Sequence, residues 1–365
     1  MRVKGLVAAE CKIPLPRPIK LGPVEIKTRD FVALRLTAED GTFGDAIGYP
    51  RGTALFESVR LLSERLMDCD VHERRAFSEN TLGSFVNGRP TFIKAASLID
   101  IALWDIAAKL AQQPLFRLLG GSRREVPVMA VGGYYLNERS IEDVCDEVRA
   151  LVDTGHQRLK IMLSGSDPEF DRRYVDAVTS VAGGKLGVDA HWSWRSLPQA
   201  LRTCRLIDDA GLLFLEDPFG AYQWPLAFQL QSHLKTQVAM GEDMPDDVSL
   251  FGLTERLSVL RVDATTCGGV GPAIDVIGAA TLRGAAVLPH VFGQLHAQLA
   301  GAYSGIEAVE YIPETTGADP LSLILRRNLK IANGMLSIDE EPGAGIELDW
   351  AGVERFQVNS FEAGN

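Results

Sequence analysis

The chain has 365 residues, of which 46% are hydrophobic and 23% charged, as in a globular protein too long for a single core. Its net charge of −11 argues against a nucleic acid or an anionic membrane as partner, and it contains no run of about 20 apolar residues that could span a membrane. The five cysteines are odd in number and widely spaced, and the first residues lack a signal-peptide pattern, so we expect a cytoplasmic protein.

Residues 1–122 predict a small capping domain that contains both strands and helices. Two stretches, 1–15 and 28–49, resemble strands of an antiparallel meander, with a turn near Gly41. Between residues 94 and 110, apolar side chains recur three and four positions apart, which predicts a helix. We therefore expect an α+β domain at the start of the chain.

A regular alternation of strands and helices follows. VPVMAVGGYY (126–135) predicts a first strand and RLKIML (158–163) a second, and six later apolar runs bring the number to eight. Helical stretches such as SIEDVCDEVRALVDTG separate them. Eight parallel strands predict a TIM-type α/β barrel over 123–325. The last segment, 326–365, contains a predicted strand and turns that we expect to pack back on the capping domain.

Polar residues close six consecutive strands of this predicted barrel. They follow one another at steps of 20–27 residues, about one strand, one helix and two loops: Asp189, Glu216, Glu242, Asp263, His290 and Glu310. Successive strand ends of a parallel barrel point to the same face of the molecule. Any single acid could instead cap the next helix, but six in register favour an active face.

The first three of these residues are carboxylates. Asp189, Glu216 and Glu242 would together provide oxygen ligands from three neighbouring strands. Such a set suits Mg²⁺, which binds few carboxylates and keeps positions open for water or substrate. The sequence therefore predicts a magnesium site at the mouth of the barrel.

Five motifs in order carry a family resemblance: IALWD (101–105), VDAHWSW (188–194), LEDP (215–218), GED (241–243) and DATTCGG (263–269). Over essentially its whole length the chain resembles the enolase superfamily, of the mandelate racemase and muconate lactonizing enzyme type. The resemblance implies a (β/α)7β barrel under an α+β capping domain. It also implies Mg²⁺-assisted removal of a proton next to a carboxylate, with an enediolate intermediate and metal ligands at the three positions above.

Two further roles follow from the resemblance. Asp263 and His290 match an Asp–His dyad in which the aspartate orients the imidazole and the histidine takes the proton. Glu310 matches a protonated acid that donates to the substrate carboxylate, and burial near other carboxylates would raise its pKa as this role requires. A lone histidine in the position of His290 would more often be structural, but the aspartate one βα unit earlier favours the dyad.

The second strand departs from the family pattern. The family carries Lys-x-Lys there, whereas this chain has Lys160 at the first position and Met162 at the second. Methionine cannot transfer a proton, so one of the two carriers that a racemase needs is missing. An alternative register makes Lys160 the base and places Arg158 before it.

The third strand departs as well, because Asp189 is followed two residues later by His191. An Asp-x-His pattern resembles acid-sugar dehydratases, in which this histidine is the general acid; alternatively, His191 only bonds a substrate hydroxyl. We therefore expect a lyase that eliminates water from a sugar acid to give a 2-keto-3-deoxy acid. A racemase, epimerase or cycloisomerase of a hydroxy or amino acid is the first alternative, and a non-catalytic metal-binding relative is the second.

Loops of the capping domain are expected to lie over the barrel mouth and to select the substrate, a small carboxylate. The segments 17–22 and 48–52 contain the candidates. Lys20 and Arg51 could meet a distal hydroxyl or carboxylate, and Tyr49 and Tyr134 could line the pocket, although each charged residue could equally be plain surface. The resemblance also implies a homo-oligomer.

Overall fold

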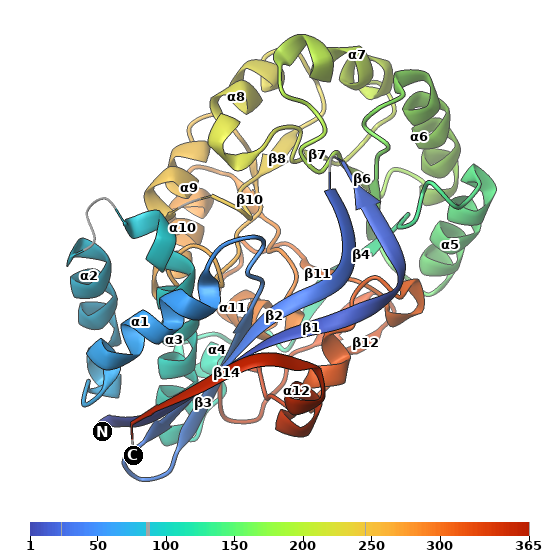
Figure 1. The fold of residues 1–365 in the computed structure, drawn as a ribbon. Helices are drawn as coiled ribbons and strands as arrows, with labels where there is room; N and C mark the ends of the chain where they lie inside the picture. Colours follow the sequence, from blue (N-terminus) through green and yellow to red (C-terminus); the bar gives the residue numbers. More distant parts are fainter. Residues whose placement is uncertain (23, 85–87, 245, 365) are drawn as a thin grey trace.

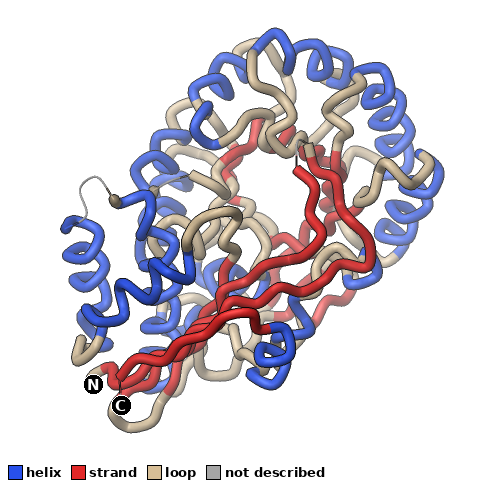
Figure 2. The backbone as a smooth tube through the Cα atoms, viewed as in Figure 1, coloured by secondary structure: helices blue, strands red, loops and turns tan. Residues whose placement is uncertain are grey.

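The computed structural model describes residues 1–22, 24–84, 88–244 and 246–364. A ring of strands and helices forms the barrel, and an elongated antiparallel sheet with its own helices lies across the barrel mouth (Figures 1 and 2). Within the described residues, no helix combines the length and the apolar character needed to cross a membrane.

The capping sheet is antiparallel and has the strand order β14-β1-β2-β3. Its strands are β1 (Val3–Leu21), β2 (Val24–Ala38), β3 (Phe43–Gly48) and β14 (Gln357–Gly364). Strands β1 and β2 are longer than predicted, because the expected loop at 17–22 continues the hairpin: Lys20 pairs with Glu25, and Leu21 with Val24. The extended hairpin reaches over the barrel mouth (Figure 1).

The helices of the capping domain pack beside this sheet. They are α1 (Leu55–Leu66), a 3-10 turn (Val71–Glu73), α2 (Arg74–Ser84), α3 (Arg89–Leu110) and α4 (Leu115–Leu118). The predicted helix at 94–110 is confirmed and begins earlier, since Pro90 suits a first helical turn. Gly44 allows β3 to approach α3 closely: a Cβ there would lie 2.0 Å from the Ala102 carbonyl oxygen.

The predicted barrel is confirmed. Its eight parallel strands are β4 (Glu125–Gly132), β5 (Arg158–Met162), β6 (Leu186–Asp189), β7 (Leu215–Glu216), β8 (Val238–Met240), β9 (Val259–Leu260), β10 (Ala286–Val287) and β11 (Val309–Tyr311). They pair in chain order from β4 to β10, and β11 pairs with β4. A bridge between Val287 and Ile306 completes the ring.

Helices surround the strands. Within the described residues the α-helices between β4 and β11 are α5 (Ile141–Asp153), α6 (Pro168–Ala182), α7 (Leu197–Ile207), α8 (Pro225–Gln231), α9 (Asp247–Leu253), α10 (Val270–Leu282) and α11 (Gly293–Ala302). One helix thus follows each of the first seven strands, which is the (β/α)7β arrangement.

The segment 326–364 contacts both parts of the molecule, whereas we expected it to pack back on the capping domain. A hairpin of β12 (Lys330–Ala332) and β13 (Met335–Ser337) pairs with the first residues of β4. Helix α12 (Trp350–Phe356) and β14 then return to β1. The last strand thus lies beside the first, with the chain ends near each other (Figure 1).

Candidate active site

Lys160 in the middle of β5 joins several strand ends at the barrel mouth. Its Nζ lies 2.9 Å from Glu216 Oε1, 2.9 Å from Glu310 Oε1 and 3.2 Å from Asp189 Oδ2. The lysine side chain is 2% exposed, so solvent screens these interactions little. One buried cation therefore holds together the ends of β5, β6, β7 and β11.

Arg261, just after β9, is a second buried cation in the same place, and our reading of the sequence missed it. Its Nε donates to Glu216 Oε1 at 2.9 Å, and its Nη2 bonds Glu310. Its Nη1 donates to the carbonyls of residues 288 and 289, at 2.7 and 3.2 Å. Strand alternation puts residues 261 and 263 on the same side, so the spacing to Asp263 was the signal that could have revealed it.

Two of the three predicted metal ligands retain a carboxylate oxygen without a hydrogen-bond partner among the described residues, although Arg261 Nη2 lies 3.9 Å from that of Glu242. Oε2 of Glu216 and Oε2 of Glu242 are buried and have no hydrogen-bond partner among the described residues. A buried acceptor left in this state is costly, and a divalent cation would satisfy both oxygens. The residues present therefore fit a hard cation such as Mg²⁺.

The predicted set of ligands does not coincide with the tightest carboxylate group. Among the described residues, ligand atoms of Asp217, Glu242 and Asp243 lie within 4.8 Å of one another, and only Glu242 belongs to both sets. Asp189 and Glu216 lie instead against the buried lysine. The assignment of Asp189, Glu216 and Glu242 as the metal ligands stays a prediction.

The structure brings Asp263 and His290 into direct contact. His290 Nδ1 lies 2.9 Å from Asp263 Oδ2, while Asp263 Oδ1 accepts from the backbone N and Oγ1 of Thr265, both at 2.7 Å. Nη2 of Arg51 lies 2.8 Å from His290 Nε2. Arginine can only donate, so Nε2 is the acceptor and the proton of a neutral imidazole is on Nδ1, facing Asp263. Nε2 is thus the ring nitrogen that can take up a proton, and Arg51 donates a hydrogen bond to it in this structure.

Comparisons with known proteins agree with this architecture. Residues 5–120 match the family model of the mandelate racemase / muconate lactonizing enzyme N-terminal domain, and residues 143–352 match the enolase C-terminal domain-like model. The chain belongs to the enolase superfamily.

Relatives in the superfamily include several dehydratases. Arabinonate dehydratase of Saccharolobus solfataricus is 26% identical over 73% of each chain. L-talarate/galactarate dehydratase of Salmonella typhimurium is 25% identical over 87% of this chain and 80% of the relative. D-galactarolactone cycloisomerase of Agrobacterium fabrum is 26% identical over 94% of this chain and 96% of the relative.

Solved structures of superfamily members share the fold. L-talarate dehydratase from a Polaromonas species, complexed with Mg and L-glucarate, has a TM-score of 0.88, 23% identity, and coverage of 100% of this chain and 99% of that chain. A racemase from Streptomyces coelicolor with bound magnesium has a TM-score of 0.87 at 20% identity, covering 98% of this chain and 100% of that chain.

Glu310 differs from the superfamily expectation in its charge. We expected burial to keep this carboxyl protonated. Burial does raise its pKa, but Arg261 and Lys160 outweigh burial and lower the pKa to about 2. The cations beside this carboxyl thus favour its ionised form, and the role of Glu310 as a protonated acid stays a prediction.

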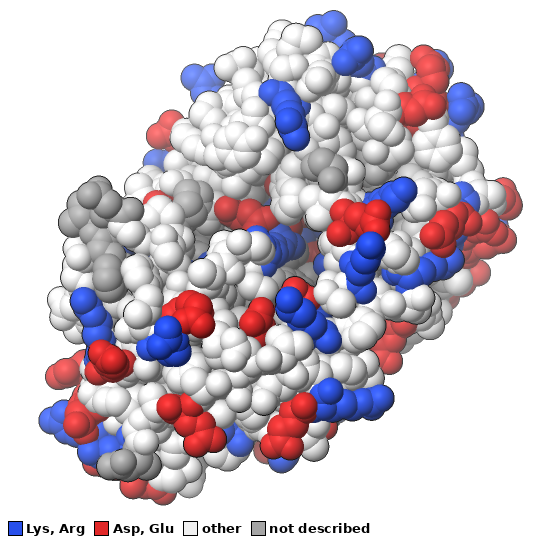
Figure 3. Space-filling view, in the orientation of Figure 1, with Lys and Arg blue, Asp and Glu red and all other residues white. Residues whose placement is uncertain are grey.

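Residues from the barrel and the capping domain line a pocket at the barrel mouth, in a hollow where acidic and basic side chains gather (Figure 3). Its lining comprises Leu21, Arg29, Tyr49, Arg51, Tyr134, Lys160, Met162, Asp189, His191, Glu242, His290, Val291, Glu310 and Ile312. Lys20 is absent from this set, because strand alternation turns its side chain to solvent. Arg29 is a member that the sequence analysis did not single out.

The lining also bears on the register of the second strand. Lys160 and Met162 both face the pocket, whereas Arg158 at the start of β5 pairs with Glu307 at 2.6 Å. This arrangement agrees with the register that puts Met162 at the position of the second family lysine.

His191 lies in a strained loop beside Asp189. Its backbone has a φ of 45°, and its N donates to Asp189 Oδ1 at 2.9 Å. Its ring packs on Trp192 with 4.3 Å between ring centroids, and Trp192 Nε1 donates to Asp217 at 3.1 Å. The tip of the β1–β2 hairpin touches this loop, since a Cβ on Gly22 would lie 2.2 Å from the His191 carbonyl oxygen.

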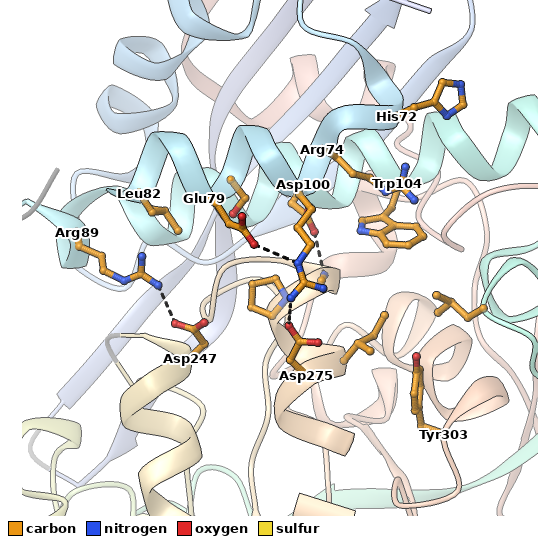
Figure 4. A pocket seen from close by; sticks show the side chains of 16 residues that line it. His72, Arg74, Glu79, Leu82, Arg89, Asp100, Trp104, Asp247, Asp275 and Tyr303 are labelled. Atoms are coloured by element: carbon orange, nitrogen blue, oxygen red, sulfur yellow. Dashed lines mark hydrogen bonds and ion pairs between the residues drawn. The ribbon is translucent and has the colours of Figure 1, made fainter. Parts of the chain in front are cut away.

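A second cavity of about 450 Å³ lies between α2 and α3 of the capping domain and the barrel helices α9 and α10 (Figure 4). Its charged groups are largely paired with one another: Arg75 with Asp275 and Arg89 with Asp247, both at 2.8 Å. At its base, Asp100 accepts from the N of Gly271 at 3.2 Å. These contacts join the two domains, and the described residues that line the cavity hold no combination of base and metal ligands comparable to the barrel mouth.

Proposed function

We propose that the protein is a Mg²⁺-dependent dehydratase of sugar acids, which removes the α-proton and then the β-hydroxyl to give a 2-keto-3-deoxy acid. The observation that carries this proposal is the pocket at the barrel mouth. Two histidines, His290 and His191, line it together with the acidic side chains that fit a cation. A base, an acid and a cation site are what an elimination of this kind requires.

Asp189, Glu216 and Glu242 would hold the cation. Magnesium in two solved structures that share the fold supports a divalent cation in this protein. Mg²⁺ bound there supplies Lewis-acid stabilisation of the negative charge that develops on the substrate carboxylate. The partnerless oxygens of Glu216 and Glu242 would be satisfied at the same time.

His290 takes the α-proton on Nε2. Asp263 accepts a hydrogen bond from Nδ1–H, fixes the tautomer and stabilises the imidazolium that forms. Lys160 supplies fixed positive charge beside the carboxylates, and Glu310, tied to Lys160 and Arg261, orients them.

His191 delivers a proton to the leaving β-hydroxyl. It lines the same pocket as His290, whereas Met162 at the position of the missing lysine cannot carry a proton. The chain therefore retains one base and one acid rather than two bases, which favours elimination over racemisation.

The test is incubation of the purified protein with aldonic and aldaric acids and Mg²⁺, followed by detection of keto acids. We expect keto acid from at least one compound and none after chelation with EDTA. Failure of every sugar acid in the presence of Mg²⁺ would rule the dehydratase proposal out.

Substitution of His191 by Asn should separate the two proton transfers. We expect dehydration to fall by about 10²- to 10⁴-fold, the usual contribution of a general acid, while His290 still exchanges the α-proton with solvent. The measurement is keto acid formation alongside deuterium incorporation in D₂O. Unchanged dehydration would show that His191 only bonds the substrate.

An isomerase is the second candidate, favoured by the D-galactarolactone cycloisomerase relative, which matches nearly the whole chain. In that case, the protein would incorporate deuterium from D₂O at the α-carbon of a substrate, or convert a lactone, without releasing a keto acid. These products distinguish the two reactions in one experiment.

A further inference from the structure

We infer, resting on the proposed function, that the substrate is an aldaric acid, a sugar acid with a carboxylate at both ends, and that Arg29 and Arg51 receive the second carboxylate. Both arginines come from the capping domain and line the pocket, whereas the base and the candidate metal ligands come from the barrel. The reacting end of the substrate would thus face the barrel, and its far end would face Arg29 and, once released from His290 and Glu242, Arg51.

Arg29 on β2 has unused hydrogen-bonding capacity in this pocket. Its Nε donates to the carbonyl of Ala318 at 2.9 Å, but no carboxylate among the described residues forms an ion pair with it. Asp319 interacts with Arg29 only at longer range. A half-buried guanidinium whose outer nitrogens lack a counter-ion is suited to a bidentate bond with a carboxylate.

Arg51 is placed so that substrate must move it. Its Nη2 donates to His290 Nε2 at 2.8 Å, the atom that has to accept the α-proton. Its Nη1 bonds Glu242 Oε1 at 2.9 Å and Asp243 Oδ2 at 2.5 Å. The base is therefore occupied until another acceptor draws this guanidinium away.

A distal carboxylate offers two charged acceptor oxygens to the planar guanidinium, so it competes for Arg51 better than a neutral hydroxyl does. The terminal hydroxyl of an aldonic acid carries no charge and competes poorly. An aldaric acid would thus both bind Arg29 and release His290, so the second carboxylate would raise kcat as well as affinity.

The experiment compares substrates that differ only at C6: galactarate with galactonate, and glucarate with gluconate. We expect kcat/KM for one aldarate to exceed that of its aldonate partner by about 100-fold or more. Arg29→Gln should lower the aldarate value by about 10- to 100-fold more than the aldonate value. Lys27→Gln, an exposed change on the same strand, is the matched control and should change neither.

Binding is measured separately by titrating galactarate and galactonate into a His290→Asn variant with and without Arg29→Gln. A tenfold weaker affinity confined to the aldarate supports the inference. Arg29→Lys, which keeps the charge, should recover part of the aldarate preference and guards against a folding defect in the glutamine variant.

Equal turnover of aldarates and aldonates, or an equal loss for both with Arg29→Gln, would overturn the inference and leave the dehydratase proposal standing. Turnover of neither class would instead overturn the proposed function itself.

Discussion

Replacing His290 with Asn is expected to reduce turnover by at least about 10³-fold, within the range that a positioned general base contributes. Asparagine fills a similar place but cannot accept the α-proton. Asp263 then loses the group it orients at 2.9 Å. The measurement is kcat for keto acid formation, together with the rate of α-proton exchange in D₂O, and both should fall by the same factor.

The matched control is His233→Asn, a change of the same residue type at an exposed position outside the pocket, which should leave kcat unchanged. Binding of Mg²⁺ to the His290 variant should stay within a few-fold of the wild type, because none of the predicted ligands is altered. Residual exchange at the wild-type rate would mean that another group, such as Lys160, abstracts the proton.

The barrel could be predicted because its signals are local and repeated. Six of the eight apolar runs end in a polar residue, and the ladder from β4 to β11 follows the order of the runs. The capping domain was harder to predict, because the segment expected as a loop at 17–22 is held in the hairpin by pairing with residues 24–26.

The pairing of the C-terminal segment 326–364 was also hard to predict from the sequence. An isolated strand pattern does not say which sheet edge it will join, and two edges were available. The hairpin of β12 and β13 joined β4, while β14 joined β1. Long-range pairing of this kind depends on the assembled surfaces rather than on neighbouring residues.

For the candidate site, the positions were more predictable than their electrostatic states. The contact between Asp263 and His290 follows from strand ends that share one face. The charge of Glu310 did not follow, since burial alone suggests a raised pKa while two buried cations lower it. One of those cations is Arg261. A single charged residue within an apolar run is usually predicted to be exposed, whereas Arg261 is buried.

Substitution of Arg261 by Met is expected to destabilise the fold by about 3–5 kcal/mol, the usual consequence of removing one partner from a buried ion pair. The arginine is fully buried and bonds Glu216, Glu310 and two backbone carbonyls. Without it, Lys160 is the remaining ion-pair partner of Glu216 and Glu310 among the described residues. Urea unfolding measures the loss, and Arg60→Met, which removes an exposed partner of Glu57, should cost no more than about 1 kcal/mol.

The pH dependence of this loss has a definite sign. The pKa of Glu310 is lowered to about 2 from 4.5, so its ionised form stabilises the folded state above pH 4.5 and this contribution disappears as the pH falls toward 2. The methionine variant lacks most of that contribution at any pH. The difference in unfolding free energy between the two proteins should therefore be largest above pH 5 and shrink in acid.

Arg261→Lys separates charge from geometry. A lysine keeps one positive charge but cannot bond Glu216, Glu310 and the carbonyls at 288 and 289 together. We expect it to recover part of the stability while the affinity for Mg²⁺ stays about 10- to 100-fold below the wild type, as for other changes to groups that orient metal ligands. If lysine restored the full affinity for Mg²⁺, the positive charge would be sufficient. The orientation of Glu216 by the planar guanidinium would then contribute nothing to Mg²⁺ binding.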